Sequence, residues 1–198
     1  MWVSLRLLAA IAAALMICTG SARAEDLAEA VASGKVSAEF EAMGGSSGDV
    51  MAVTVKKLDK NGPDIPLTVR AGTRLKTGNA DEQEMYIAGL KGLLMNGDRY
   101  RPVPGMEASD EPATYVLDAY CAELEKENPS PGGGYAMGAV DAVIACILDK
   151  AARLSTAARQ AAVWIHTDQA TYAQVRDKFR VSKKDWKAAE SVVRKCRQ

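Results

Sequence analysis

Cys121 and Gln160 are the residues of this chain whose chemistry stands out first. Cys121 directly follows a strand-like segment, and Gln160 lies within an otherwise apolar stretch of a predicted helix. A buried amide that lacks hydrogen-bond partners costs about 1–3 kcal/mol. We therefore expect Gln160 either to be hydrogen-bonded or to react. Attack of a thiol on its side-chain carbonyl carbon would form an internal thioester and release ammonia.

A second arrangement combines Cys121 with His166, the only histidine, and with Asp168. These are the residue types of a cysteine nucleophile, its base and the group that orients the base. However, His166 and Asp168 are two residues apart near a predicted helix end, and no known cysteine-hydrolase signature surrounds Cys121. We expect His166 to cap the last carbonyls of its helix instead. The sequence thus favours a protein that is not an enzyme, with a cysteine hydrolase as an alternative.

The N-terminus has the features of a secretory signal peptide covering residues 1–24. Arg6 precedes a continuous apolar run over residues 7–17, and Ala22-Arg23-Ala24 fits a small-x-small cleavage site. The run is shorter than the roughly 20 apolar residues of a permanent membrane span. We expect a mature chain that begins at Glu25, has no stable membrane span, and is secreted or periplasmic. An uncleaved anchor is the alternative.

Three cysteines remain in that mature chain, and cysteines tend to pair in an oxidising compartment. Cys146 lies off the apolar stripe of its predicted helix, which indicates a partner on a second face. Cys196 lies on the apolar face of the last predicted helix, together with Trp186. A Cys146–Cys196 disulfide is therefore predicted, leaving Cys121 as the odd thiol, although three cysteines permit other pairings.

Charge and motif content exclude several function classes. The 25 basic and 25 acidic residues balance, and a signal peptide containing Arg6 and Arg23 leaves the mature chain slightly acidic. A nucleic-acid-binding protein would show a basic patch or stripe, and none is present in the sequence. One histidine and no CxxC pair make a structural zinc site improbable. We expect no nucleic acid, metal or cofactor.

Hydrophobic periodicity predicts strands first and helices second, which is an α+β order. Alternating apolar residues and turn signals predict strands at 36–42, 50–58, 65–69, 84–94 and 114–117. Helical spacing predicts helices at 119–128, 138–151, 156–165 and 171–178, and from 182 to the end. Ser155, Thr171 with Gln174, and Ser182 are the predicted caps of the last three. The expected fold is a single domain over residues 25–198. It has an antiparallel β-rich half at 35–118, sandwich or barrel-like, and a helical half at 119–198.

The pair Tyr120-Cys121 and the later stretch Gln160-Ala-Ala162-Val-Trp164 resemble the motifs of the thioester-domain family of bacterial surface adhesins. The order of the motifs, the cysteine before the helical glutamine, also agrees. His166 and Asp168 complete the stretch that is similar. The chain departs from the family pattern at the residue before the glutamine, where Arg159 replaces a threonine, and at Ala122, where an aromatic is common.

The resemblance implies that Cys121 is the acyl acceptor and Gln160 the acyl donor of an internal thioester. Such a bond captures an amine or hydroxyl on a partner protein or surface ligand. The alternative is a structural or binding module stabilised by a disulfide, in which no thioester forms.

Overall fold

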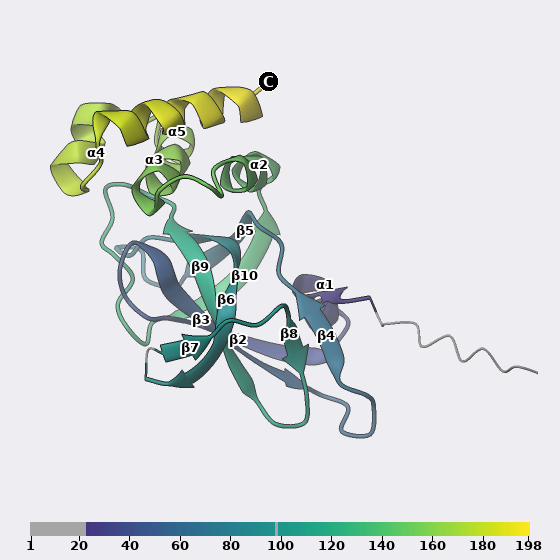
Figure 1. The fold of residues 1–198 in the computed structure, drawn as a ribbon. Helices are drawn as coiled ribbons and strands as arrows, with labels where there is room; N and C mark the ends of the chain where they lie inside the picture. The colour runs from purple at the N-terminus through teal and green to yellow at the C-terminus, as the bar shows by residue number, and fades with distance from the viewer. Residues whose placement is uncertain (1–22, 98) are drawn as a thin grey trace, which may run out of the picture.

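Six antiparallel strands of the chain close into a barrel. The structure, a computed structural model, describes residues 23–97 and 99–198. The barrel strands pair in the order β5-β10-β2-β3-β9-β6, and a β5–β6 pairing closes the ring. Their bounds are β2 Val36–Ala42, β3 Ser47–Lys57, β5 Thr73–Thr77, β6 Met85–Asn96, β9 Ala113–Cys121 and β10 Gly134–Val140. The barrel is shown in Figure 1, with β7 (Arg99–Arg101) paired antiparallel to the last residues of β6.

The β2–β3 hairpin shows why this half of the chain forms strands. In β2 every second residue is apolar, and Phe40 pairs with Val53 on the buried side while Glu39 pairs with Thr54 on the other side. This hairpin was predicted, and β3 begins three residues earlier than expected, at Ser47.

A small second sheet packs beside the barrel. Its strands β1 (Glu25–Asp26), β4 (Ile65–Thr68) and β8 (Met106–Ala108) pair in the order β1-β4-β8. Helix α1 (Leu27–Ala32) follows β1 directly, and the Asp26 carboxylate accepts hydrogen bonds from the main-chain N–H groups of Ala28 and Glu29. β1 begins at the residue where the mature chain is predicted to start. The predicted signal peptide itself, except for Arg23 and Ala24, lies outside the described residues.

The predicted helix at 119–128 is wrong, because β9 continues to Cys121. Residues 119–121 pair with β6, with Ala119 opposite Ile87 and Cys121 opposite Met85. The hydrogen bonds and buried contacts that residues 119–121 gain between β3 and β6 outweigh their weak local preference for a helix. No helix follows at 122–128, where the chain forms bends and a short bridge.

The expectation that residues 114–117 form the last strand is also wrong. β10 overlaps the start of the helix predicted at 138–151, and it closes the barrel between β5 and β2. Its glycines hide the strand signal, and Gly138 approaches the main-chain oxygen of Arg74 so closely that a Cβ would lie 3.1 Å away. A barrel is thus confirmed, but it extends beyond the predicted β-rich half at 35–118 to include β10, and the helices lie mostly in the C-terminal part.

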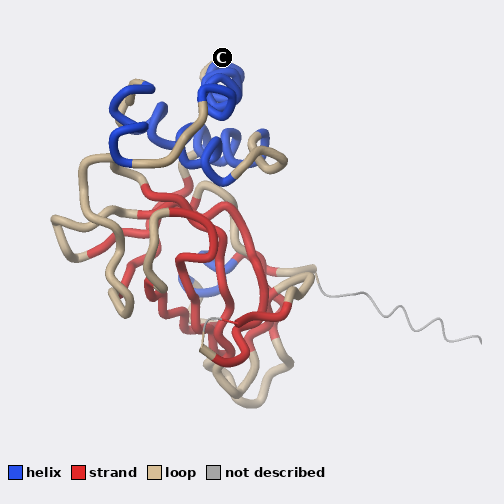
Figure 2. The backbone as a smooth tube through the Cα atoms, turned by 60° about the vertical axis from the view of Figure 1, so that its left-hand side comes forward, coloured by secondary structure: helices blue, strands red, loops and turns tan. Residues whose placement is uncertain are grey.

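Four C-terminal helices cover one end of the barrel, as Figures 1 and 2 show. They are α2 Ala142–Lys150, α3 Thr156–Thr167, α4 Tyr172–Lys178 and α5 Lys183–Cys196. The predicted caps are confirmed at Ser155 for α3, at Thr171 with Gln174 for α4, and at Ser182 for α5. Helix α2 begins later than expected, after the cap Asp141.

The predicted disulfide joins two helices of the helical layer, α2 and α5. Cys146 of α2 and Cys196 of α5 are bonded, with their Cα atoms 5.8 Å apart. Gly72, which precedes β5, allows the start of α2 to approach closely, because a Cβ there would lie 2.6 Å from the main-chain oxygen of Asp141. Among the described residues, no helix combines the length and apolar character needed to cross a membrane.

Candidate functional site

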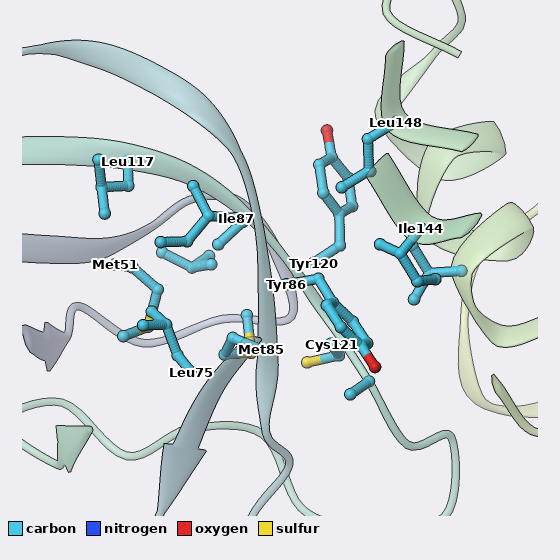
Figure 3. Close-up of a cluster of buried hydrophobic side chains, with 14 of the residues drawn as sticks. Met51, Leu75, Met85, Tyr86, Ile87, Leu117, Tyr120, Cys121, Ile144 and Leu148 are labelled. Atoms are coloured by element: carbon cyan, nitrogen blue, oxygen red, sulfur yellow. The ribbon is translucent and has the colours of Figure 1, made fainter. Parts of the chain in front are cut away.

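Cys121 is the last residue of β9 and lies where the barrel meets the helical layer. Its side chain is fully buried, and it is the free cysteine of the described residues. Figure 3 shows its sulfur directed toward Met85 and away from the helices, whereas Tyr120, its neighbour, points toward Leu148 of α2. Burial raises the pKa of the Cys121 thiol, with a smaller contribution from Glu123. The thiol therefore remains protonated at neutral pH.

Gln160 reaches Cys121 from the second turn of α3. Its side chain is 0% exposed, its Oε1 accepts a hydrogen bond from the main-chain N–H of Cys121 at 3.0 Å, and its Nε2 donates to the carbonyl of Cys121 at 2.9 Å. The same N–H also donates to the carbonyl of Ser46 at 3.1 Å. The pairing of β3 with β9 begins at Ser47 and Tyr120, so β3 does not reach the carbonyl of Cys121. The Gln160 amide bonds this carbonyl in its place, as a neighbouring strand would. Both polar atoms of this buried amide are satisfied.

An ion pair beside this contact was not anticipated from the sequence. Arg159 Nη1 lies 2.7 Å from Asp118 Oδ2, and the two side chains are 16% and 11% exposed. The guanidinium also lies over the ring of Tyr120, 5.2 Å from its centroid. Arg159 precedes Gln160, and Asp118 is three residues before Cys121. The ion pair therefore holds α3 on β9 next to the Gln160–Cys121 contact. An acidic residue inside an apolar strand was the signal that could have revealed it.

His166 and Asp168 lie at the C-terminus of α3, where His166 is in its last turn and Asp168 is the residue after it. They line a cavity of about 290 Å³ together with Arg74, Tyr86, Ala122, Glu123, Asp141 and Thr167. His166 Nδ1 accepts a hydrogen bond from Arg197 Nε at 3.3 Å, and Asp168 Oδ2 accepts one from Leu124 N–H at 3.3 Å. Burial lowers the pKa of His166 and raises that of Asp168.

The expected capping role of His166 is wrong in its detail. The carbonyls of Ile165 and His166 accept hydrogen bonds from Arg197 Nη2, at 2.9 Å and 3.2 Å. A cation thus meets the helix C-terminus as predicted, but it is a guanidinium supplied by the chain end.

The arrangement gives a cysteine hydrolase little support. Among the described residues, Cys121 has no hydrogen bond with His166, and its protonated thiol lacks the electropositive surroundings of a catalytic cysteine. Ala162 and Trp164, the other motif residues of α3, are core residues. The Trp164 ring packs edge-on against Phe179, with ring centroids 5.4 Å apart. No group of three acidic, histidine or cysteine side chains suited to a metal occurs in residues 23–97 and 99–198.

Comparison with models of protein families, with curated proteins and with solved structures gives no match to this chain. The resemblance to thioester domains therefore rests on the motif residues alone and stays a prediction. What the structure adds is the spatial meeting of two of those residues, Cys121 and Gln160.

Proposed function

We propose that this chain is a non-catalytic binding module acting in a secreted or periplasmic setting, in which Cys121 and Gln160 form an internal thioester that captures a partner. The observation that carries the proposal is the contact between the Gln160 amide and the main chain of Cys121. Two residues selected as an acyl donor and acceptor are adjacent although they lie on different elements. The disulfide is compatible with an oxidising compartment.

The surroundings of the pair favour an acyl transfer at Gln160. The main-chain N–H of Cys121 donates to Gln160 Oε1 and so polarises the carbonyl that the thiol would attack. The Cys121 Sγ–H bond and the Gln160 Cδ–Nε2 bond break, an Sγ–Cδ bond forms, and the amide nitrogen leaves as ammonia with the thiol proton. This step requires the sulfur to rotate from Met85 toward Gln160. An amine or hydroxyl of the partner then attacks Cδ and releases the thiol.

A disulfide-stabilised module without a thioester is the second candidate. One observation favours it: both polar atoms of the Gln160 amide are hydrogen-bonded while Cys121 and Gln160 are fully buried. In that case, the glutamine serves only to complete the end of β9, and the partner is bound without a covalent bond.

The intact mass of the mature protein, measured before and after methylamine treatment, separates the two candidates. A thioester gives a mass short by one ammonia, in addition to the two hydrogens of the disulfide, and methylamine then adds to it. Cys121→Ala and Gln160→Ala should each abolish the adduct, whereas the exposed Gln198→Ala should retain it. A mass short only by the disulfide hydrogens, with no adduct, would reject the thioester and leave the second candidate.

A further inference from the structure

A cavity of about 290 Å³ opens beside the Cys121–Gln160 contact. Ser46 lines it and also accepts the hydrogen bond from Cys121 N–H, and Trp164, one turn after Gln160 on α3, lines it from the helical side. Its other walls include Gln83, Leu124, Asn128 and Phe179. The β-barrel and the helical layer therefore both contribute to it.

Two lining side chains each contain a buried polar atom that lacks a hydrogen-bond partner among the described residues. These atoms are the Nε1 of Trp164, a donor, and the Oε1 of Gln83, an acceptor. The two residues are 3% and 2% exposed. Gln83 Nε2 donates to the carbonyl of Lys126 at 3.1 Å, which fixes the amide so that its oxygen stays free. Unpaired buried groups are rare in proteins and demand an explanation.

We propose that this cavity binds the amide group of an uncharged ligand, with the ligand carbonyl accepting from Trp164 Nε1 and the ligand N–H donating to Gln83 Oε1. An amide matches these two atoms in kind, because it carries one acceptor and one donor. Its apolar flank fits the side chains of Leu124 and Phe179. The volume lies near the lower limit of small-molecule sites, roughly 300 Å³, and suits one acetamido sugar or one peptide unit.

The two groups that need partners favour a neutral ligand. The lining lysines, Lys126 and Lys178, are already paired with Glu123 and Glu125, and the third charged residue of the lining, Glu127, is exposed to solvent. The two atoms that need partners belong to neutral groups, and burying an uncompensated charge against them would be costly.

Entry to the site requires a local rearrangement. Both unpaired atoms are buried, and the partly exposed Phe179, which follows the last residue of α4, packs edge-on against Trp164. We expect the Phe179 ring to move when the ligand enters. The inference does not rest on the thioester, since neither Cys121 Sγ nor the Gln160 amide contributes a contact to the ligand.

The test is a titration of ¹⁵N-labelled protein in which the indole N–H signal of Trp164 is followed, with that of Trp186 as an internal control. N-acetylglucosamine and N-acetylalanine methylamide are the amide probes from the two ligand sources, and glucose, which lacks the acetamido group, is the matched control. We expect a saturable shift of the Trp164 signal with at least one amide probe and none with glucose. The probe that binds more tightly identifies the source as a sugar or a peptide.

Two variants complete the test. Gln83→Leu should weaken binding roughly tenfold or more, because it removes the acceptor, and Cys121→Ala should leave the affinity unchanged. The absence of a saturable Trp164 shift with both amide probes would overturn the proposal, as would an equal shift with glucose. If Gln83→Leu does not fold, the comparison of N-acetylglucosamine with glucose on the unaltered protein still decides. The Cys121→Ala result separates this site from the thioester, which that variant cannot form.

Discussion

The side-chain amide of Gln160 pairs with the main chain of Cys121 through two hydrogen bonds, one in each direction, at 3.0 Å and 2.9 Å. This is the geometry with which a neighbouring strand would extend the sheet. Helix α3 therefore supplies the donor for the Cys121 carbonyl beyond the start of β3, and this contact joins the helical layer to the barrel beside the Arg159–Asp118 ion pair.

Replacing Gln160 should destabilise the fold even when no thioester can form. In a Cys121→Ala background, Gln160→Met leaves the carbonyl at position 121 buried without its donor, and we expect a loss of about 1–3 kcal/mol in the free energy of unfolding. Urea denaturation measures it, and the exposed Gln198→Met is the control. A change no larger than that of the control would mean that the amide pair contributes nothing to stability.

The Arg159–Asp118 ion pair should couple α3 to β9. Because both side chains are largely buried, removing only Arg159 leaves a carboxylate without its partner, and we expect Arg159→Met to cost about 3 kcal/mol. Adding Asp118→Asn to Arg159→Met should restore part of the lost stability, and a double-mutant cycle measures that coupling. The exposed pair Lys178–Glu125 is the matched control, and Lys178→Met should cost less than about 1 kcal/mol. Additive effects in the first cycle would contradict the coupling.

Reduction of the Cys146–Cys196 disulfide should destabilise the chain. The bond closes a loop with a sequence separation of 50, and the chain-entropy relation gives roughly 4 kcal/mol for that length. Thermal unfolding of the Cys146→Ala/Cys196→Ala double variant against the oxidised protein measures the effect. Reductant should lower the melting temperature of the parent and leave that of the double variant unchanged. An equal fall in both would show that the effect of the reductant does not come from the Cys146–Cys196 bond.

His166 should make stability depend on pH in the mildly acidic range. Its pKa is lowered in the folded state, first by burial and then by Arg197, against an opposing effect of Asp141. The unfolded chain, with a histidine pKa of about 6.5, therefore binds the proton more tightly. Stability from this residue is full above that value and is lost as the pH falls toward the folded pKa.

His166→Gln should consequently flatten the pH dependence of the melting temperature between about pH 7 and pH 5. Asp168→Asn provides the opposite control, because burial raises the pKa of Asp168. That carboxyl contributes stability at low pH, which is lost as the pH rises through the unfolded and then the folded pKa. An unaltered profile in His166→Gln would assign the pH dependence to other groups.

Local signals in the sequence determined much of the helical layer. Ser155, Thr171 and Ser182 mark helix starts because a side-chain oxygen before a helix satisfies main-chain N–H groups that the helix leaves free. The Cys146–Cys196 disulfide was also predictable, because the helical period fixes the face of its helix on which each cysteine lies.

Only the tertiary structure decided the junction between barrel and helices. Residues 119–121 and the glycine-rich β10 take strand conformation because they pair with β6, β2 and β5, and no local pattern encodes such distant hydrogen bonds. The sequence by itself selected Cys121 and Gln160 as candidates. Their contact, the Arg159–Asp118 pair beside it and the cavity at Trp164 depend on how α3 packs against the end of β9, which is a property of the folded chain.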